Sequence, residues 1–300
     1  MQTDHRHRPA RCADAAALAR HLRDSRADTL ATFAAYQQAL PELQVPQRAE
    51  LNPPLWELGH IGWFQEYWIA RNDQRALGCQ ANPDIARPPG VRSGADNLYH
   101  SSRVAHDTRW SLPLPNAADT CADLHTQLAQ TLALLADTPN SHADLYFFRL
   151  ALVHEDMHHE AALYMAQSLG LPICDPRWQT PRLPQTIAPQ LQVPATRWQL
   201  GTPTDTAHFC FDNELGACEQ ALAPYDIDSA VVSWAQYLEF VEAGGYSQSQ
   251  WWSPDGQRWL ASHAAPCPRY LRREGGAWQQ WRHGQWTALP LDAPACHLSY

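Results

Sequence analysis

The sequence lacks the long apolar runs and the paired cysteines that mark several common classes of protein. No apolar run approaches the ~20 residues of a membrane-spanning helix, and residues 1–9 are polar, unlike the apolar core of a secretory signal. None of the 8 cysteines belongs to a CxxC pair, so no zinc knuckle is indicated. We therefore expect a cytoplasmic protein with no membrane partner and with free thiols, while the even cysteine count leaves a disulfide framework open.

Basic residues are also few. The chain has 22 Lys+Arg against 31 Asp+Glu, a formal net charge of −9 at pH 7, and no basic run or stripe. This argues against nucleic acid as a partner, because phosphate recognition needs a basic surface. The composition is 45% hydrophobic, which allows a sizeable core. The 300 residues are enough for about two domains of the usual ~100–200 residues each.

Helical periodicity dominates the first half of the chain. It predicts four helices, over about 14–39, 54–71, 117–137 and 143–169. Asp14 can cap the first helix, Pro53 and Pro54 open the second, and Gly170 can end the fourth. The stretch 72–115 is rich in Pro, Gly, Asn and Ser, and loops of this length are usually functional or disordered.

The texture of the sequence changes after about residue 172. Prolines are frequent, strands are short, and only 234–243 has a clear helical pattern. We predict an α+β protein of two domains, a four-helix bundle at 1–175 and a mixed α/β domain at 176–300. Because 294–300 reads like the start of another amphipathic segment, we expect the second domain to be truncated.

Three histidines are the strongest chemical signal. His154 and His158 are four residues apart on the predicted fourth helix, so both imidazoles project from one face, about 40° apart on the helical wheel. His60 lies on the predicted second helix, on the face that also carries Trp56 and Phe64. These faces point to the bundle interior, where an unsatisfied polar group costs ~1–3 kcal/mol. A shared metal ion would satisfy all three and leave coordination positions open for substrate, water or dioxygen.

Two other interpretations use the same histidines. Each could be a hydrogen-bonded core residue, which is common for a single buried histidine. Residues 154–158 also match H-E-x-x-H, the zinc-peptidase pattern in which Glu155 would be the general base. No third ligand follows downstream at the spacing of the extended peptidase motif, which weakens this interpretation.

A di-iron site is a further alternative. Glu57 and His60, like Glu155 and His158, form E-x-x-H pairs, and two such helices are half of a di-iron carboxylate bundle. The other two helices should then each supply an inward glutamate. The helices predicted in the first and third positions have none, so the bridging carboxylates are missing.

Five motifs occur in order over about residues 13–300. They are Trp56-x-x-x-His60-x-x-Trp63-Phe64-x-Glu66, His154-x-x-x-His158-x-Glu160, Phe211-Asp-Asn-Glu214, Tyr225-Asp-Ile-Asp228 and the run 237–246. Together they resemble the non-haem iron sulfoxide synthases of ergothioneine biosynthesis and the related selenoneine synthases. That family joins a DinB-like helical domain to a domain like formylglycine-generating enzyme, with a C-type-lectin-like fold. The resemblance implies the same two domains here.

The resemblance also implies a chemistry. His60, His154 and His158 would bind Fe(II) and leave sites for dioxygen and substrate. The enzyme would be an oxygen-dependent oxidoreductase that joins a sulfur or selenium donor to the imidazole C2 of histidine betaine (hercynine). Its partners would be small molecules: hercynine, the donor and O2. A trimethylammonium group suits aromatic surroundings, through cation–π attraction of ~0.5–2 kcal/mol, and the chain has 13 Trp.

Departures from the family's usual pattern concern the substrates. Met157 precedes the last ligand, where ergothioneine synthases often have a substrate-holding Gln. Residues 55–59 read Leu-Trp-Glu-Leu-Gly rather than the more usual Trp-His-Leu-Ala, and this version resembles the selenoneine branch, which we favour. A donor-binding arginine is expected in the loop after the second helix. Arg103 is the candidate, with a solvated loop arginine as the alternative. The family's catalytic tyrosine would lie beyond residue 300, so no catalytic residue is predicted.

A protein of another class could share these features. A binding module would have a degenerate iron site and a lectin-like second domain that recognises a partner. Such a module would carry no stoichiometric iron, so metal analysis of the purified protein separates it from the enzyme.

Overall fold

The computed structural model describes residues 10–175, 177, 180–183, 190–204, 206, 208–262 and 266–298. Backbone contacts divide the chain into two compact units. The first runs to Leu169 and also includes Gln199–Cys218; the second comprises Gly170–Trp198 and the chain from Glu219 onward. These units have other bounds than the domains predicted at 1–175 and 176–300, and the assignment of those domains to the two family folds stays a prediction.

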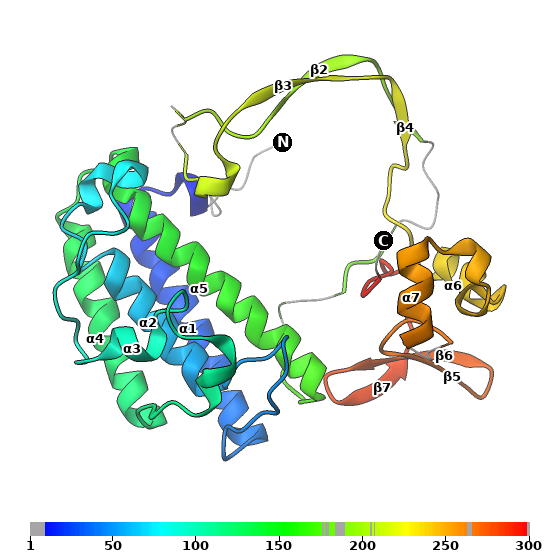
Figure 1. Cartoon of the computed structure of the whole chain (residues 1–300), viewed down its shortest axis with the longest axis horizontal. Helices are drawn as coiled ribbons and strands as arrows, with labels where there is room; N and C mark the ends of the chain where they lie inside the picture. Colours follow the sequence, from blue (N-terminus) through cyan, green and yellow to red (C-terminus); the bar gives the residue numbers. More distant parts are fainter. Residues whose placement is uncertain are drawn as a thin grey trace. The chain divides into compact units, whose positions relative to one another are not determined.

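Four long helices pack side by side in the first unit (Figure 1). They are α1 (Ala15–Ala39), α2 (Pro54–Trp68), α4 (Ala117–Ala136) and α5 (His142–Leu169). Their shared core includes Leu18, Leu22, Leu145 and Phe148, each with no exposed surface. Burial of such a side chain contributes ~1.5–3 kcal/mol. The helical half is therefore arranged as the periodicity predicts.

Local signals explain where these helices begin and end. The Asp14 side chain accepts a hydrogen bond from the Ala17 amide at 2.8 Å, and Asn116 accepts one from Asp119 at 2.9 Å. Pro54 occupies the first turn of α2. Gly170 follows α5 with a φ of +72°, the left-handed conformation that glycine adopts without strain.

The stretch between α2 and α4 is ordered around the bundle. It contains η2 (Arg75–Gln80), α3 (Ala95–Tyr99) and η3 (His106–Trp110). Arg71 donates two hydrogen bonds to the Asp96 carboxylate, at 2.7 and 2.8 Å, and the Trp63 indole donates a third. These contacts, led by that of Arg71, lower the pKa of Asp96 to about 2. They tie α3 to the end of α2.

A later segment also belongs to the first unit. Phe209 is fully buried and packs on Tyr146 of α5, and its amide donates to the Arg11 carbonyl beside η1 (Ala10–Cys12). Arg11 forms an ion pair with Glu214 at 2.8 Å, and the Phe211 amide donates to the same carboxylate. The Phe211-Asp-Asn-Glu214 motif, which includes η4 (Asp212–Glu214), therefore anchors this segment to the helical unit.

In the part of the second unit that the structure describes, short antiparallel strands are accompanied by two helices. Strands β5 (Leu271–Glu274), β6 (Ala277–Arg282) and β7 (Gln285–Ala288) form one antiparallel sheet. Strand β1 (Leu191–Val193) pairs antiparallel with β4 (Tyr225–Ile227), while β2 (Thr196–Leu200) pairs with β3 (Cys218–Leu222). Trp234, Leu238, Leu271 and Leu289 belong to its core.

The helix predicted at 234–243 is α6 (Trp234–Glu242), capped by Ser233. The expectation of one clear helix was wrong, because α7 (Pro254–Ser262) follows after η5 (Gly245–Ser247) and η6 (Ser249–Trp251). Pro254 and Gly256 resemble turn residues in sequence. The Ser253 hydroxyl accepts from the Gly256 amide at 3.2 Å and starts the helix.

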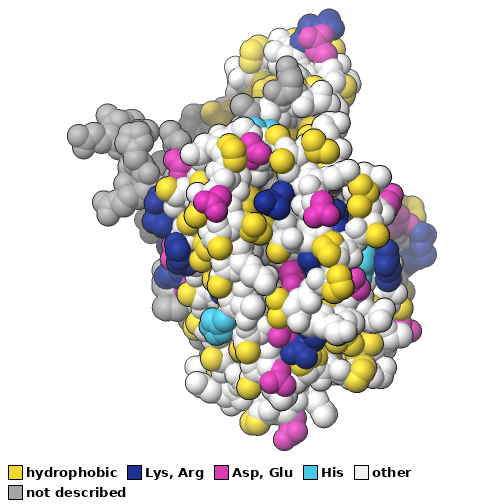
Figure 2. Space-filling model, turned by 90° about the vertical axis from the view of Figure 1, so that its left-hand side faces the viewer, with side chains coloured by type: hydrophobic (Ala, Val, Ile, Leu, Met, Phe, Trp, Pro, Cys, Tyr) yellow, Lys and Arg dark blue, Asp and Glu magenta, His cyan; other side chains and the backbone are white. Residues whose placement is uncertain are grey.

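The surface and the thiols add two observations. On the face drawn in Figure 2, the described basic and acidic side chains lie among one another and do not gather by sign. All 8 cysteines are free thiols. Among the described residues, no helix is long and apolar enough to span a membrane.

Candidate metal centre

His60 is held from behind by the backbone. Its side chain is 3% exposed, and its Nδ1 lies 2.8 Å from the carbonyl oxygen of Tyr99 in α3. Because a carbonyl can only accept, Nδ1 carries the proton and Nε2 keeps its lone pair. The Trp56 ring stacks on the imidazole at 4.8 Å between centroids, with 9° between the planes. The ring of His60 is therefore fixed in both orientation and tautomer.

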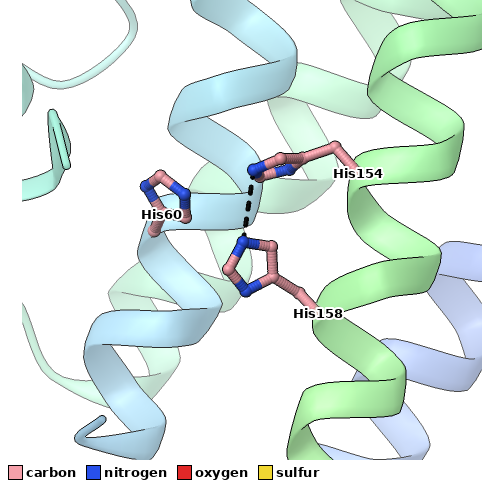
Figure 3. Close-up of side chains that lie close together, drawn as sticks. All are labelled: His60, His154 and His158. Atoms are coloured by element: carbon pink, nitrogen blue, oxygen red, sulfur yellow. Dashed lines mark hydrogen bonds between the residues drawn. The ribbon is translucent and has the colours of Figure 1, made fainter. Parts of the chain in front are cut away.

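His154 and His158 face His60 from the neighbouring helix. Both are half-buried and project from one side of α5, toward the ring of His60 on α2 (Figure 3). The Nε2 atoms of His154 and His158 are 3.2 Å apart. Phe64 of α2 stacks on His154 at 3.5 Å between centroids. The ligand atoms of the three histidines all lie within 4.8 Å of one another.

Glu57 lies behind His158. Its Oε2 is 2.5 Å from His158 Nδ1, and its Oε1 accepts from Asn52 Nδ2 at 2.6 Å. Asn52 in turn accepts from Arg109 Nη1 at 2.9 Å. The Arg109 guanidinium lies over the Trp56 ring, 3.9 Å from its centroid. The back of the site is therefore a continuous polar and aromatic network.

The electrostatics favour neutral rings at His60 and His154. Burial, with the nearby His158, lowers the pKa of His60 to about 4, and burial also lowers the pKa of His154 well below its usual range. Burial alone would raise the pKa of Glu57, but hydrogen bonding and attraction from His158 hold it below its usual value. Near neutral pH, His60 and His154 thus present unprotonated ring nitrogens, and the Glu57 carboxylate nearby is ionised. Metal binding requires this protonation state.

The donor set fits a divalent transition metal. Imidazole nitrogen suits iron, zinc, copper and nickel, and three protein ligands leave open positions. The Nδ1 atoms of His60 and His158 are occupied by Tyr99 and Glu57, so both Nε2 atoms are available on the shared side. Among the described residues, His60, His154 and His158 form the group of potential ligands (His, Cys, Asp or Glu) that lie close enough together to hold one metal ion. The structure therefore brings together the three histidines that the sequence predicts as ligands.

The position of Glu155 argues against the two alternatives that require it, the zinc peptidase and the di-iron site. Its carboxylate forms a buried ion pair with Arg26 at 2.7 Å, and the two side chains are 1% and 2% exposed. A zinc-peptidase general base must reach the metal-bound water, and a di-iron ligand must reach the metals. The paired, enclosed Glu155 is oriented for neither role.

Arg103 is exposed in the turn after α3, with its amide donating to the His100 carbonyl at 2.8 Å. It does not belong to the histidine group, and its role as a donor-binding residue stays a prediction. Met157, beside the ligands on α5, is 46% exposed.

Sequence reasoning missed the residues behind the ligands. The only role that the sequence suggests for Glu57 by itself is that of a di-iron ligand, although a charged residue one turn before His60 in an apolar segment is a usable signal. Arg109 carries no such signal, because its contact with Asn52 joins residues 57 positions apart. Asn52 lies five positions before Glu57, but a polar residue next to prolines is typical of a helix start and does not by itself indicate this contact. The role of Tyr99 is that of a backbone carbonyl, which any residue could supply.

The chain is similar to three proteins named hercynine oxygenase. It is 29% identical to the one from Mycolicibacterium smegmatis over 255 residues, which cover 83% of this chain and 56% of that protein. It is 28% identical to the one from Mycobacterium tuberculosis over 297 residues, which cover 94% of this chain and 63% of that protein. It is 27% identical to the one from Mycolicibacterium thermoresistibile over 293 residues, which cover 95% of this chain and 60% of that protein.

The chain therefore spans about three fifths of the length of these relatives. No protein-family model matches it. The three names support the part of the motif-based resemblance that concerns oxidation of hercynine. They do not distinguish a sulfur donor from a selenium donor.

Proposed function

We propose that this chain carries the metal site of an Fe(II)- and O2-dependent oxidoreductase that acts on hercynine. The reaction joins a sulfur or selenium donor to the imidazole C2 of hercynine. One observation carries the proposal: the ligand atoms of three histidines meet within 4.8 Å in a chain similar, over 83 to 95% of its length, to proteins named hercynine oxygenase. In a protein of this similarity, three-histidine donors with open positions suit oxygen activation.

The chain's own residues define what the site does. His60, His154 and His158 would hold the iron, and the bound iron would supply the reaction with O2. Trp56 and Phe64 stack on two of the ligands and keep water from their faces. The buried rings stay unprotonated near neutral pH, so proton competition for the ligand atoms is weak.

Substrate recognition is part of the proposal. Aromatic rings suit the trimethylammonium group of hercynine, and an arginine suits a carboxylate of the donor. Arg103 remains the proposed donor contact. The preference for selenium rests on the resemblance of residues 52–60 to the selenoneine branch, and the ergothioneine-type reaction with a thiol donor is the alternative.

The two units fit this proposal as domains. The four helices correspond to the DinB-like domain, and the later part of the chain to the domain like formylglycine-generating enzyme. The relatives are longer than this chain, and the proposal assigns no catalytic group among residues 1–300.

A competition experiment tests the proposed reaction. The protein is incubated with Fe(II), O2, hercynine and equimolar sulfur and selenium donors, and the product is identified by mass. We expect a hercynine adduct joined through selenium, as selenoxide or in its reduced form. An adduct through sulfur alone would replace the selenoneine assignment by the ergothioneine-type one. No oxygen-dependent adduct with either donor would contradict the proposed function.

A further inference from the structure

Glu57 is a carboxylate in an enclosed place. The residue is 6% exposed at the first turn of α2, and burying a charge is costly unless it is paired and hydrogen-bonded. Each of its oxygens has a defined partner: His158 Nδ1 at 2.5 Å and Asn52 Nδ2 at 2.6 Å. These two hydrogen bonds offset the cost of burying the Glu57 carboxylate, and one of them is made to a candidate metal ligand.

The contact with His158 determines which nitrogen faces the site. An ionised carboxylate can only accept, so His158 Nδ1 donates and its Nε2 keeps the lone pair, directed toward Nε2 of His154. Oε2 of Glu57 lies on the Nδ1 side of the ring, away from the shared metal position. Glu57 is therefore oriented to act on His158 and not to bind the ion itself.

The network of contacts behind Glu57 also reaches His60, the ligand on α2. Asn52 accepts from Arg109 at 2.9 Å, and Arg109 lies 3.9 Å over the ring of Trp56. Trp56 stacks on His60. The outer contacts of His158 and His60, ligands on different helices, thus converge on one arginine at the end of η3.

We propose that Glu57 is the positioning residue of this metal centre: it fixes the tautomer and orientation of His158 and strengthens it as a ligand. Asn52 and Arg109 hold Glu57 in place. The sequence is consistent with this role, because Glu57 is a charged residue within an otherwise apolar stretch of α2 and lies one turn before His60. Outer carboxylates of this kind typically change metal affinity ~10–100-fold when removed. The inference rests on the proposed metal binding by the three histidines.

Metal titration tests this role without requiring turnover. Co(II) is added to the metal-free chain, and both the dissociation constant and the visible absorption spectrum are recorded for wild type, Glu57→Gln and Glu57→Ala. Glu160→Gln is the matched control, since it changes an exposed carboxylate on the same helix as His158. Far-UV circular dichroism confirms that each variant is folded.

We expect Glu57→Gln, which is isosteric but uncharged, to weaken Co(II) binding ~10-fold, and Glu57→Ala to weaken it by up to ~100-fold. The absorption bands should change in both, while Glu160→Gln behaves as wild type. Asn52→Ala should weaken binding by a smaller factor, and it decides the question if the Glu57 variants do not fold.

Two outcomes would overturn the inference, and they are distinguishable. Wild-type affinity and spectrum in the Glu57 variants, or in Asn52→Ala if only that variant folds, would leave the metal site intact and remove this role for Glu57. Failure of wild type and Glu160→Gln to bind Co(II) or Fe(II) would instead remove the metal site, and the proposed function with it.

Discussion

Gly59 shows how one missing side chain shapes the site. It lies on α2 directly before His60, and a Cβ built there would overlap the phenol ring of Tyr99. The carbonyl of the same Tyr99 accepts the hydrogen bond from His60. Glycine at this position therefore lets α3 approach closely enough to orient a ligand.

We predict that Gly59→Ala displaces Tyr99 and weakens the metal site. Overpacking typically costs ~1–3 kcal/mol, partly offset by the ~0.5–1 kcal/mol that Ala gains over Gly in a helix. Gly62→Ala is the matched control, because its Cβ would overlap Gln127 of α4 and not Tyr99. Urea unfolding should show both variants destabilised, whereas Co(II) titration should show weaker binding in Gly59→Ala alone. Equal Co(II) affinity in the two variants would contradict this account.

At the scale of single residues, the sequence predicts the ligands but not the residues that hold them in place. His154 and His158 are recognisable because an i, i+4 pair is a local pattern on a helix. The hydrogen bond from His158 to Glu57 joins residues 101 positions apart, and no local pattern encodes such a contact. The partner of His60 is a carbonyl, which leaves no trace in the side-chain sequence.

At the scale of the helices, Arg26 joins all four members of the bundle. From α1 it donates to Glu155 of α5, to the Leu124 carbonyl of α4 and to the Gln65 side chain of α2, at 2.7, 2.5 and 3.0 Å. Glu155 neighbours His154 in sequence, so this ion pair fixes the turn of α5 from which the ligand projects.

We predict that Arg26→Leu destabilises the fold by ~3–5 kcal/mol, because it leaves the buried Glu155 carboxylate unpaired. The double variant Arg26→Leu/Glu155→Leu removes both charges and should recover much of that loss. Urea unfolding of wild type and the variants measures the difference. Equal destabilisation in the single and double variants would show that the unpaired charge is not the cause.

The same scale shows which elements a sequence specifies locally. The four long helices begin and end close to the predicted positions, because Asp14, Pro54 and Gly170 act on adjacent backbone. Helix α7 was missed because Pro254 and Gly256 read as turn residues. Strands β1 and β4 depend on pairing between distant segments, as Leu191 with Ile227, and this information is not local.

At the scale of the whole molecule, the chain comprises two compact units and spans about three fifths of its relatives' length. The three predicted ligands all lie in the first unit, on α2 and α5. The metal site can therefore be tested by metal binding, independently of the proposed reaction.

Iron binding is the most direct test of the central claim. Metal-free wild-type chain and His154→Ala are titrated with Fe(II) under anaerobic conditions, and bound iron is counted per chain. We predict one iron per wild-type chain and none retained by His154→Ala, because two imidazoles on separate helices cannot replace a three-histidine site. Two irons per chain, no iron in the wild type, or full retention by His154→Ala would contradict a mononuclear three-histidine centre.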